Sequence, residues 1–257
     1  PLIKQASDVT EKRHMVYTYP EYITTFSTMI IQKVTHTLKG MITLVIDFLF
    51  PTSPDIALLE HISLSDFVAI LPPAPQGTIA EPWIHAVLGY RNHVVRTAIW
   101  EVKYRGNKKI IALLAGVLYE EIVSELSDLA LFSDTLTGKI LLIPVPLSPA
   151  RLRERGFNQT ELLAKKLSIL DSGTFFNLDT TSLLKIKDTP SQTKSKNRAE
   201  REKNLKGCFT VAHPDSVHNK YILLLDDVCT TGSTLREARK TLLKAGAKAV
   251  YAITVAH

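Results

Sequence analysis

Hydrophobic and polar positions alternate in a regular way over the last half of the chain. From residue 138 onward, apolar runs of strand length are followed by polar loops and by stretches with helical spacing. This alternation is typical of a parallel sheet covered by helices on both faces. We expect strands over 139–145, 182–187, 221–225 and 249–255, and helices over 157–170 and 233–245. The pattern therefore predicts an α/β fold with a parallel sheet flanked by helices.

The first half of the chain has a different pattern. A strand near 85–90 and helices over 93–104 and 108–126 lead into the alternating region. Residues 16–50 have apolar positions at three and four spacing, which predicts an amphipathic helix ended by Pro51. Five prolines between 51 and 75 predict a connecting subregion without regular structure. We therefore expect two parts: 1–82, an N-terminal helix with a Pro-rich connecting subregion, and 83–257, the α/β domain.

Composition narrows the class of protein. With 45% hydrophobic and 22% charged residues, the 257-residue chain is folded rather than disordered or fibrous. Its net charge of +6 suits a phosphate-bearing ligand or a nucleic acid. The longest apolar run, 41–50, is too short to span a membrane. Neither the two cysteines, Cys208 and Cys229, nor the eight histidines have metal-ligand spacing, and we expect a cytoplasmic location.

The segment 221–235, YILLLDDVCTTGSTL, carries the strongest chemical signal. Five apolar residues form a buried strand, two acids stand at its carboxyl end, and a hydroxyl-rich turn leads into a helix. Ligands of open α/β sheets bind at this end of the strands. Backbone amides, hydroxyls and the positive end of the helix dipole together make a cradle for a phosphate. Its expected members are Thr230, Thr231, Gly232, Ser233 and Thr234.

The acid pair needs a ligand of its own. Asp226 and Asp227 would repel an anion, but their oxygens can accept hydrogen bonds from the two neighbouring hydroxyls of a ribose and can support Mg²⁺ indirectly. The alternative interpretation is a plain strand-end turn that precedes a helix.

This arrangement resembles the motif with which type I phosphoribosyltransferases bind 5-phosphoribosyl 1-diphosphate (PRPP). The resemblance implies the type I phosphoribosyltransferase fold, here with an N-terminal helical extension. It also implies that Asp226 and Asp227 are catalytic residues that hold the ribose, that residues 230–234 bind the 5′-phosphate, and that Mg²⁺ is the cofactor.

Three further segments narrow the resemblance to the ComF (ComFC-like) family. They are KYRG at 103–106, PVPL at 144–147 followed by RLRERGFNQ at 151–159, and TPSQ at 189–192 with Arg201, Asn204 and GCF at 207–209. Family members commonly carry a cysteine-rich zinc module after a Phe-Pro pair. Here Phe50-Pro51 is present, but no cysteine follows it before Cys208.

Two basic segments are candidates for binding the diphosphate. Arg151, Arg153 and Arg155 could offer planar, bidentate donors, although they could also belong to a solvated basic loop. The polar loop 188–206 holds six lysines and arginines against three acids, and the resemblance favours Gln192 and Arg201 as its binding residues. The alternative is that this segment is a surface loop that binds no ligand.

The sequence leaves two functions open. The first is a phosphoribosyltransferase that transfers 5-phosphoribosyl with loss of diphosphate to an unknown acceptor, in a family associated with DNA uptake in natural transformation. The second is a non-catalytic protein that senses PRPP or a nucleotide and binds single-stranded nucleic acid. Only Phe157 and Phe209 are aromatic near the basic segments, so base stacking has little support from the sequence.

Overall fold

The structure is a computed structural model that describes residues 54–74, 81–132, 139–188 and 205–257. Residues 53–257 form one compact unit. The helix predicted over 16–50, together with Gln192 and Arg201, lies outside the described residues.

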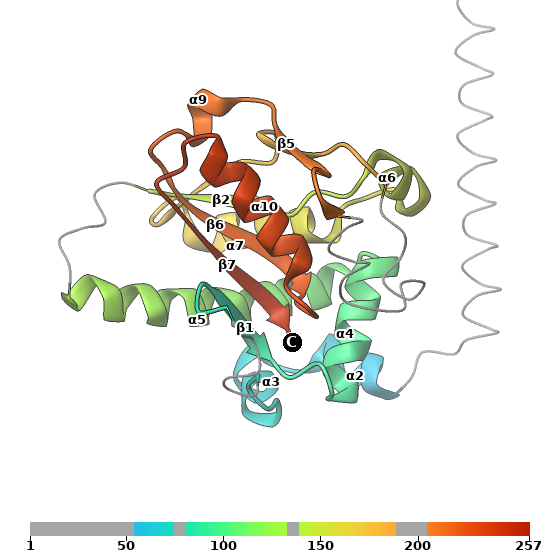
Figure 1. Cartoon of the computed structure of the whole chain (residues 1–257). Coiled ribbons are helices and arrows are strands. Elements are labelled where there is room, and N and C mark those ends of the chain that lie inside the picture. Colours follow the sequence, from blue (N-terminus) through green and yellow to red (C-terminus); the bar gives the residue numbers. More distant parts are fainter. Residues whose placement is uncertain (1–53, 75–80, 133–138, 189–204) are drawn as a thin grey trace, which may run out of the picture. The chain divides into compact units, whose positions relative to one another are not determined.

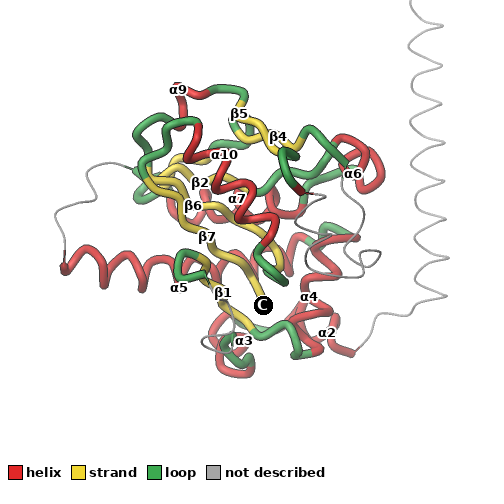
Figure 2. The backbone as a smooth tube through the Cα atoms, viewed as in Figure 1, coloured by secondary structure: helices red, strands yellow, loops and turns green. Residues whose placement is uncertain are grey.

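A five-stranded sheet forms the centre of this unit. Its strands run in the order β1-β7-β6-β2-β3, and all neighbouring pairs are parallel. The strands are β1 (Ile84–Leu88), β2 (Ile140–Pro144), β3 (Phe176–Leu178), β6 (Tyr221–Val228) and β7 (Ala249–Ala256). The α/β class that the sequence predicts is therefore confirmed. Figure 2 shows these strands gathered between the helices.

Helices cover both faces of the sheet, and each face has its own core. On one face, α4 (His93–Tyr104), α5 (Lys108–Phe132) and α7 (Gln159–Asp171) pack against Leu142, Leu225 and Ile253. On the other face, α10 (Ser233–Lys244) packs against Ile143, Leu224 and Ala252. Figure 1 shows α10 in front of β6 and β7. Successive residues of the central strands thus lie in different cores, because side chains along a strand alternate between the two faces of the sheet.

The Pro-rich subregion contains helices, which the sequence analysis did not expect. Helix α2 (Pro54–His61) begins at Pro54, and α3 (Leu64–Ile70) ends before Pro72. Proline is tolerated in the first turn of a helix because the N–H that it lacks has no helical partner there. Leu59, Phe67 and Leu71 are buried in the same core as α4 and α5.

Two further details differ from the prediction. The segment expected as a strand over 182–187 forms β4 (Leu183–Lys185), which pairs antiparallel with β5 (Phe209–Val211) outside the main sheet. The arginine segment, expected as a loop, is the short helix α6 (Pro149–Arg155). Its Pro149 stands in the first turn, and Gly156 ends it with a φ of 83°. A four-residue helix, α9 (Pro214–Val217), precedes β6.

None of the helices in the described ranges is long and apolar enough to cross a membrane.

Candidate functional site

The acid pair lies near the carboxyl end of β6, in the middle of the sheet. Asp226 and Asp227 are neighbours near the end of this strand, and their carboxyl groups lie close enough to interact with each other. Asp227 is buried, whereas Asp226 is partly accessible. The backbone N–H of Asp227 donates to Asp226 Oδ1 at 2.9 Å, which holds the two groups in a fixed relation.

Two side chains from other helices contact the carboxylate of Asp227. Gln159, the first residue of α7, donates from Nε2 to Asp227 Oδ2 at 3.0 Å. Lys103, in the last turn of α4, places Nζ 3.4 Å from the same oxygen. A buried carboxylate needs such partners because its water shell is lost. The second carboxylate oxygen accepts from the N–H of Val228 at 2.8 Å.

Asp226 has a different electrostatic environment. Burial of its carboxyl, with the neighbouring charge of Asp227 as a second cause, raises the pKa of Asp226 to about 8. The hydrogen bond from the Asp227 N–H and the charge of Lys103 oppose this rise. A proton therefore stays on Asp226 at neutral pH unless a cation or hydroxyl donors favour the ionised form. Two neighbouring carboxylates also match the oxygen ligands that Mg²⁺ prefers, so the residues present fit this cofactor.

The turn that follows β6 is built around Gly232. Its φ is +70°, and an added Cβ would lie 3.2 Å from Ile84 Cδ1, so both backbone and space favour glycine. The N–H of Cys229 donates to Ala256 O at 2.9 Å and ties the turn to the end of β7. Thr231 Oγ1 and Ser233 Oγ lie 2.7 Å apart at the start of α10. The turn therefore places hydroxyls at the amino end of a twelve-residue helix, directly after the acid pair.

Two of the motifs quoted for the ComF resemblance pack against each other beside this site. Gly106, which ends KYRG, has a φ of +60°, and the ring of Phe157 lies 3.3 Å from the position of a Cβ there. Asn158 accepts from Thr160 N to cap α7 and donates to Val145 O at the end of β2. The packing brings Lys103 and Gln159, one from each motif, to the same oxygen of Asp227.

The three arginines of α6 do not all face the site. Arg155 donates to Gln159 Oε1, so it joins the chain of contacts that reaches Asp227. Arg151 stands four residues earlier, on the same side of the helix, and its charge reaches Lys185. Arg153 is exposed. It stands two residues from Arg151 and two from Arg155, so it lies on another side of the helix.

Lys185 is a site residue that the sequence analysis missed. It lies on β4, and burial lowers the pKa of its ammonium group, while Cys208 and Asp226 act in the opposite direction. No signal in the sequence marks it, because β4 was expected inside the main sheet. Gln159 was part of a quoted motif, but only the structure reveals its contact with Asp227.

Exposed aromatic rings lie next to the arginines, contrary to the expectation that only Phe157 and Phe209 are near. Trp100 and Tyr104 on α4 have ring centroids 5.3 Å apart and are 48% and 55% exposed. Arg105 lies 5.4 Å from the Trp100 ring centroid, and Arg155 lies 5.4 Å from that of Tyr104. We call these four side chains the aromatic–arginine surface. The sequence analysis missed it because Tyr104 and Arg155 are far apart in the chain.

The chain is similar in sequence to several known proteins. The chain is 31% identical over 156 residues to competence protein ComFC of Bacillus subtilis (strain 168), which is 60% of this chain and 56% of the relative. It is 37% identical over 111 residues to competence protein F of Haemophilus influenzae, covering 42% and 46%. It is 36% identical over 155 residues to DNA utilization protein YhgH of Escherichia coli (strain K12), covering 59% and 62%. The chain thus spans less than two thirds of each relative, and these matches confirm the resemblance to the ComF family.

No family model matches the chain. Among solved structures, it is similar to hypoxanthine phosphoribosyltransferase from Trypanosoma cruzi, with 11% identity and a TM-score of 0.35, over 57% of this chain and 64% of the other. It is also similar to HGPRT-ase from Leishmania tarentolae in complex with GMP, with 16% identity and a TM-score of 0.32, over 58% and 66%. These structural similarities are weak and partial.

The raised pKa of Asp226 predicts how stability depends on pH. Between pH 4 and about 8 the folded state keeps a proton that the unfolded chain has lost, so the free energy of unfolding falls as pH rises through this window. Asp226→Asn removes the titrating group. We expect this variant to gain on the order of 1–2 kcal/mol relative to wild type between pH 5 and pH 8, allowing for partial solvent access.

Urea denaturation at the two pH values, with chelator present, measures this change. Asp215→Asn, an exposed aspartate in α9, is the matched control and should show no gain. Equal behaviour of the two variants would contradict the assignment.

Proposed function

We propose that this chain binds PRPP and acts as a phosphoribosyltransferase, transferring the 5-phosphoribosyl group with loss of diphosphate to an acceptor that the sequence does not identify. The observation that carries the proposal is the succession of an acid pair, in which Asp227 is buried, and a hydroxyl-rich turn at the carboxyl end of a central strand. Lys103, Lys185, Arg151 and Arg155 gather cationic charge around the same strand end. This charge suits a ligand with two phosphate groups.

Each part of the site has a role in this proposal. Asp226 and Asp227 accept hydrogen bonds from the ribose 2′- and 3′-hydroxyls, and binding of those donors draws Asp226 into its ionised form. The turn 230–234 binds the 5′-phosphate with hydroxyls and with N–H groups at the start of α10. Gln159 and Lys103 keep the carboxylate of Asp227 in place while the sugar binds.

The reaction breaks the bond between C1 of the ribose and the diphosphate oxygen and forms a bond from C1 to the nucleophilic atom of the acceptor. In the transition state, positive charge develops on the sugar ring and negative charge on the departing diphosphate. Mg²⁺, when bound, neutralises the diphosphate. Arg151 and Arg155 stabilise the same developing negative charge with fixed guanidinium groups, and the acid pair lies near the positive ring. Most of the rate enhancement would therefore be electrostatic.

The names of the relatives, two competence proteins and a DNA utilization protein, support a role of the proposed activity in the handling of DNA, such as uptake in natural transformation. A cytoplasmic site of action fits such a role. The site lies within the region 83–257, which we propose as the functional domain.

A second function, binding of single-stranded nucleic acid with or without turnover of PRPP, is favoured by the aromatic–arginine surface. Exposed rings offer stacking platforms for bases, and arginines beside them can pair with phosphates. Arg155 belongs to both this surface and the contacts that reach Asp227. A strand bound there would thus lie next to the proposed PRPP site.

The first test removes the acid pair. Asp226→Asn combined with Asp227→Asn should weaken PRPP binding in the presence of Mg²⁺ by at least about 100-fold, because two charge-assisted acceptors of the ribose hydroxyls are lost. Isothermal titration calorimetry measures the affinity, and circular dichroism checks that the variant is folded. Undiminished affinity in the folded variant would exclude this site.

The arginines of α6 allow a matched comparison within one helix. Arg151→Ala with Arg155→Ala should weaken PRPP binding by about tenfold or more and ribose 5-phosphate binding by much less, because only PRPP carries the diphosphate. Arg153→Ala removes one positive charge, half of what the double variant removes, from the exposed side of α6 and should change both affinities little. Equal losses for the two ligands would indicate a general charge effect instead.

The aromatic–arginine surface can be tested with a short single-stranded oligothymidylate. Trp100→Ala with Tyr104→Ala should weaken binding by about tenfold or more in fluorescence anisotropy, since stacking on one ring stabilises a base by about 1–3 kcal/mol. Tyr251→Ala, which removes another exposed ring from β7, is the control. Binding that depends on salt but not on Trp100 and Tyr104 would contradict a stacking role.

A further inference from the structure

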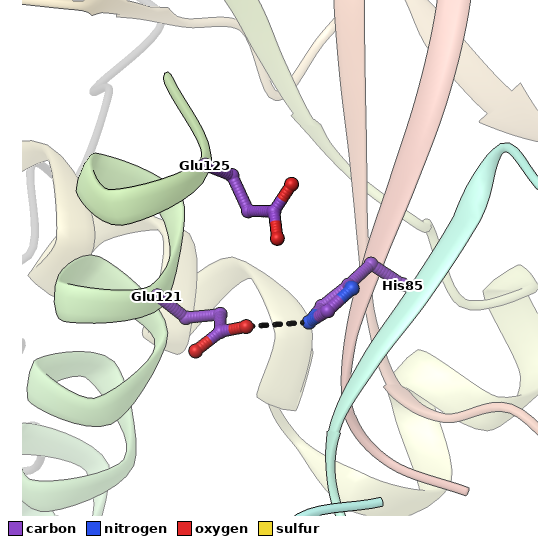
Figure 3. A group of neighbouring side chains, drawn as sticks. All are labelled: His85, Glu121 and Glu125. Carbon is purple, nitrogen blue, oxygen red and sulfur yellow. Dashed lines mark ion pairs between the residues drawn. The ribbon is translucent and has the colours of Figure 1, made fainter. Parts of the chain in front are cut away.

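A second cluster of chemically active side chains lies away from the acid pair. His85 on β1 and Glu121 and Glu125 on α5 offer three ligand atoms that all lie within 4.8 Å of one another. Figure 3 shows the three side chains directed toward one another across the space between the strand and the helix. We propose that these residues bind a divalent transition-metal ion, with Zn²⁺ as the representative. This inference does not depend on the proposed function.

Residue spacing along the chain does not reveal this cluster. The histidines were expected to have no ligand pattern, and His85 is 36 positions before Glu121 in the chain. Glu121 and Glu125 are one helical turn apart and so share a side of α5. The fold supplies the third ligand by placing β1 opposite that side.

The distances suit one ion. Zn²⁺ lies about 2.0–2.2 Å from nitrogen and oxygen ligands, so two of its ligands in tetrahedral geometry are at most about 3.6 Å apart. The three atoms, all within 4.8 Å, need only a small side-chain adjustment to meet this limit. His85 Nε2 and Glu121 Oε1 are already 2.8 Å apart, and an ion would replace this contact.

The charges also favour a cation. In the described part of the chain, the ion pair of Glu121 is with His85, and no lysine or arginine pairs with Glu125. With a neutral imidazole, the cluster carries two negative charges, which a divalent ion neutralises. The side chains of His85 and Glu121 are 45% and 35% exposed, so an ion could enter from solvent and keep water as its remaining ligands.

The ligand types select the class of ion. An imidazole nitrogen favours zinc and its transition-metal neighbours, whereas Mg²⁺ and Ca²⁺ prefer sites made of oxygen alone. The cluster thus differs from the acid pair of β6, whose ligands are all carboxylate oxygens. Binding through Nε2 leaves the imidazole proton on Nδ1 and releases any proton held by Nε2.

An ion in this position would join the edge strand β1 to α5. The flanking residues Ile84, Leu118 and Ile122 are buried, so the strand and the helix that carry the ligands are anchored in the two cores. Ile84, next to His85, is the residue that packs against Gly232 in the turn after β6. The metal would therefore fix the strand that supports this turn.

The test uses the full chain after treatment with chelator. Isothermal titration calorimetry with Zn²⁺ in a non-coordinating buffer should detect a site of about one ion per chain, and Glu125→Gln should weaken it at least about tenfold. Glu120→Gln is the matched control, because it removes the same charge from an exposed neighbour on α5. A titration of Asp226→Asn with Asp227→Asn, which should keep the site, separates this cluster from the acid pair.

Thermal unfolding gives a second measurement. Zn²⁺ should raise the Tm of the wild type and of Glu120→Gln, and it should raise that of His85→Asn and Glu125→Gln much less. Equal zinc affinities of Glu125→Gln and Glu120→Gln would overturn the proposal. The proposal would also be overturned if the wild type bound no zinc and His85→Asn lost stability in the absence of zinc. In that case His85 and Glu121 would form an ion pair only.

Discussion

An acid pair at the carboxyl end of β6, with Asp227 buried and Asp226 partly accessible, is the constraint on which the site depends. Two carboxylates cannot lie side by side away from water unless other groups supply hydrogen bonds or opposite charge. Asp227 obtains these from Gln159 and Lys103, while the pKa of Asp226 rises because burial and Asp227 disfavour its ionised form. The free site is therefore less stable as the pH rises, and a ligand that favours the charged form would offset this cost.

The elements around the acid pair hold Asp227 and the turn after β6 in place. Lys103 in the last turn of α4 and Gln159 at the start of α7 reach the same oxygen of Asp227. The ring of Phe157, just before α7, packs against Gly106, just after α4, where a side chain would interfere. His257 Nδ1 lies 2.7 Å from Cys229 O, and this contact helps to hold the turn. Burial raises the pKa of the Cys229 thiol to about 11, so the thiol is protonated at neutral pH.

Several expectations from the sequence were accurate because they rest on short-range patterns. The apolar runs of β2, β6 and β7 and the helical spacing of α4 and α10 depend on neighbours a few residues apart. Three predictions of secondary structure were wrong. The segment of β4 pairs with β5 rather than with the main sheet, the arginine segment folds as α6, and helices α2 and α3 occur among the prolines.

The sequence by itself determined the α/β class, through the alternation from residue 138 onward, and the order of strand, acid pair, turn and helix, which is local to 221–235. The tertiary structure alone decided which distant side chains meet there. It brought Lys103 and Gln159 to Asp227, put Tyr104 beside Arg155, and set His85 opposite Glu121. The physical reason is that side-chain encounters between separate elements depend on sheet order and helix packing, which residue spacing along the chain does not encode.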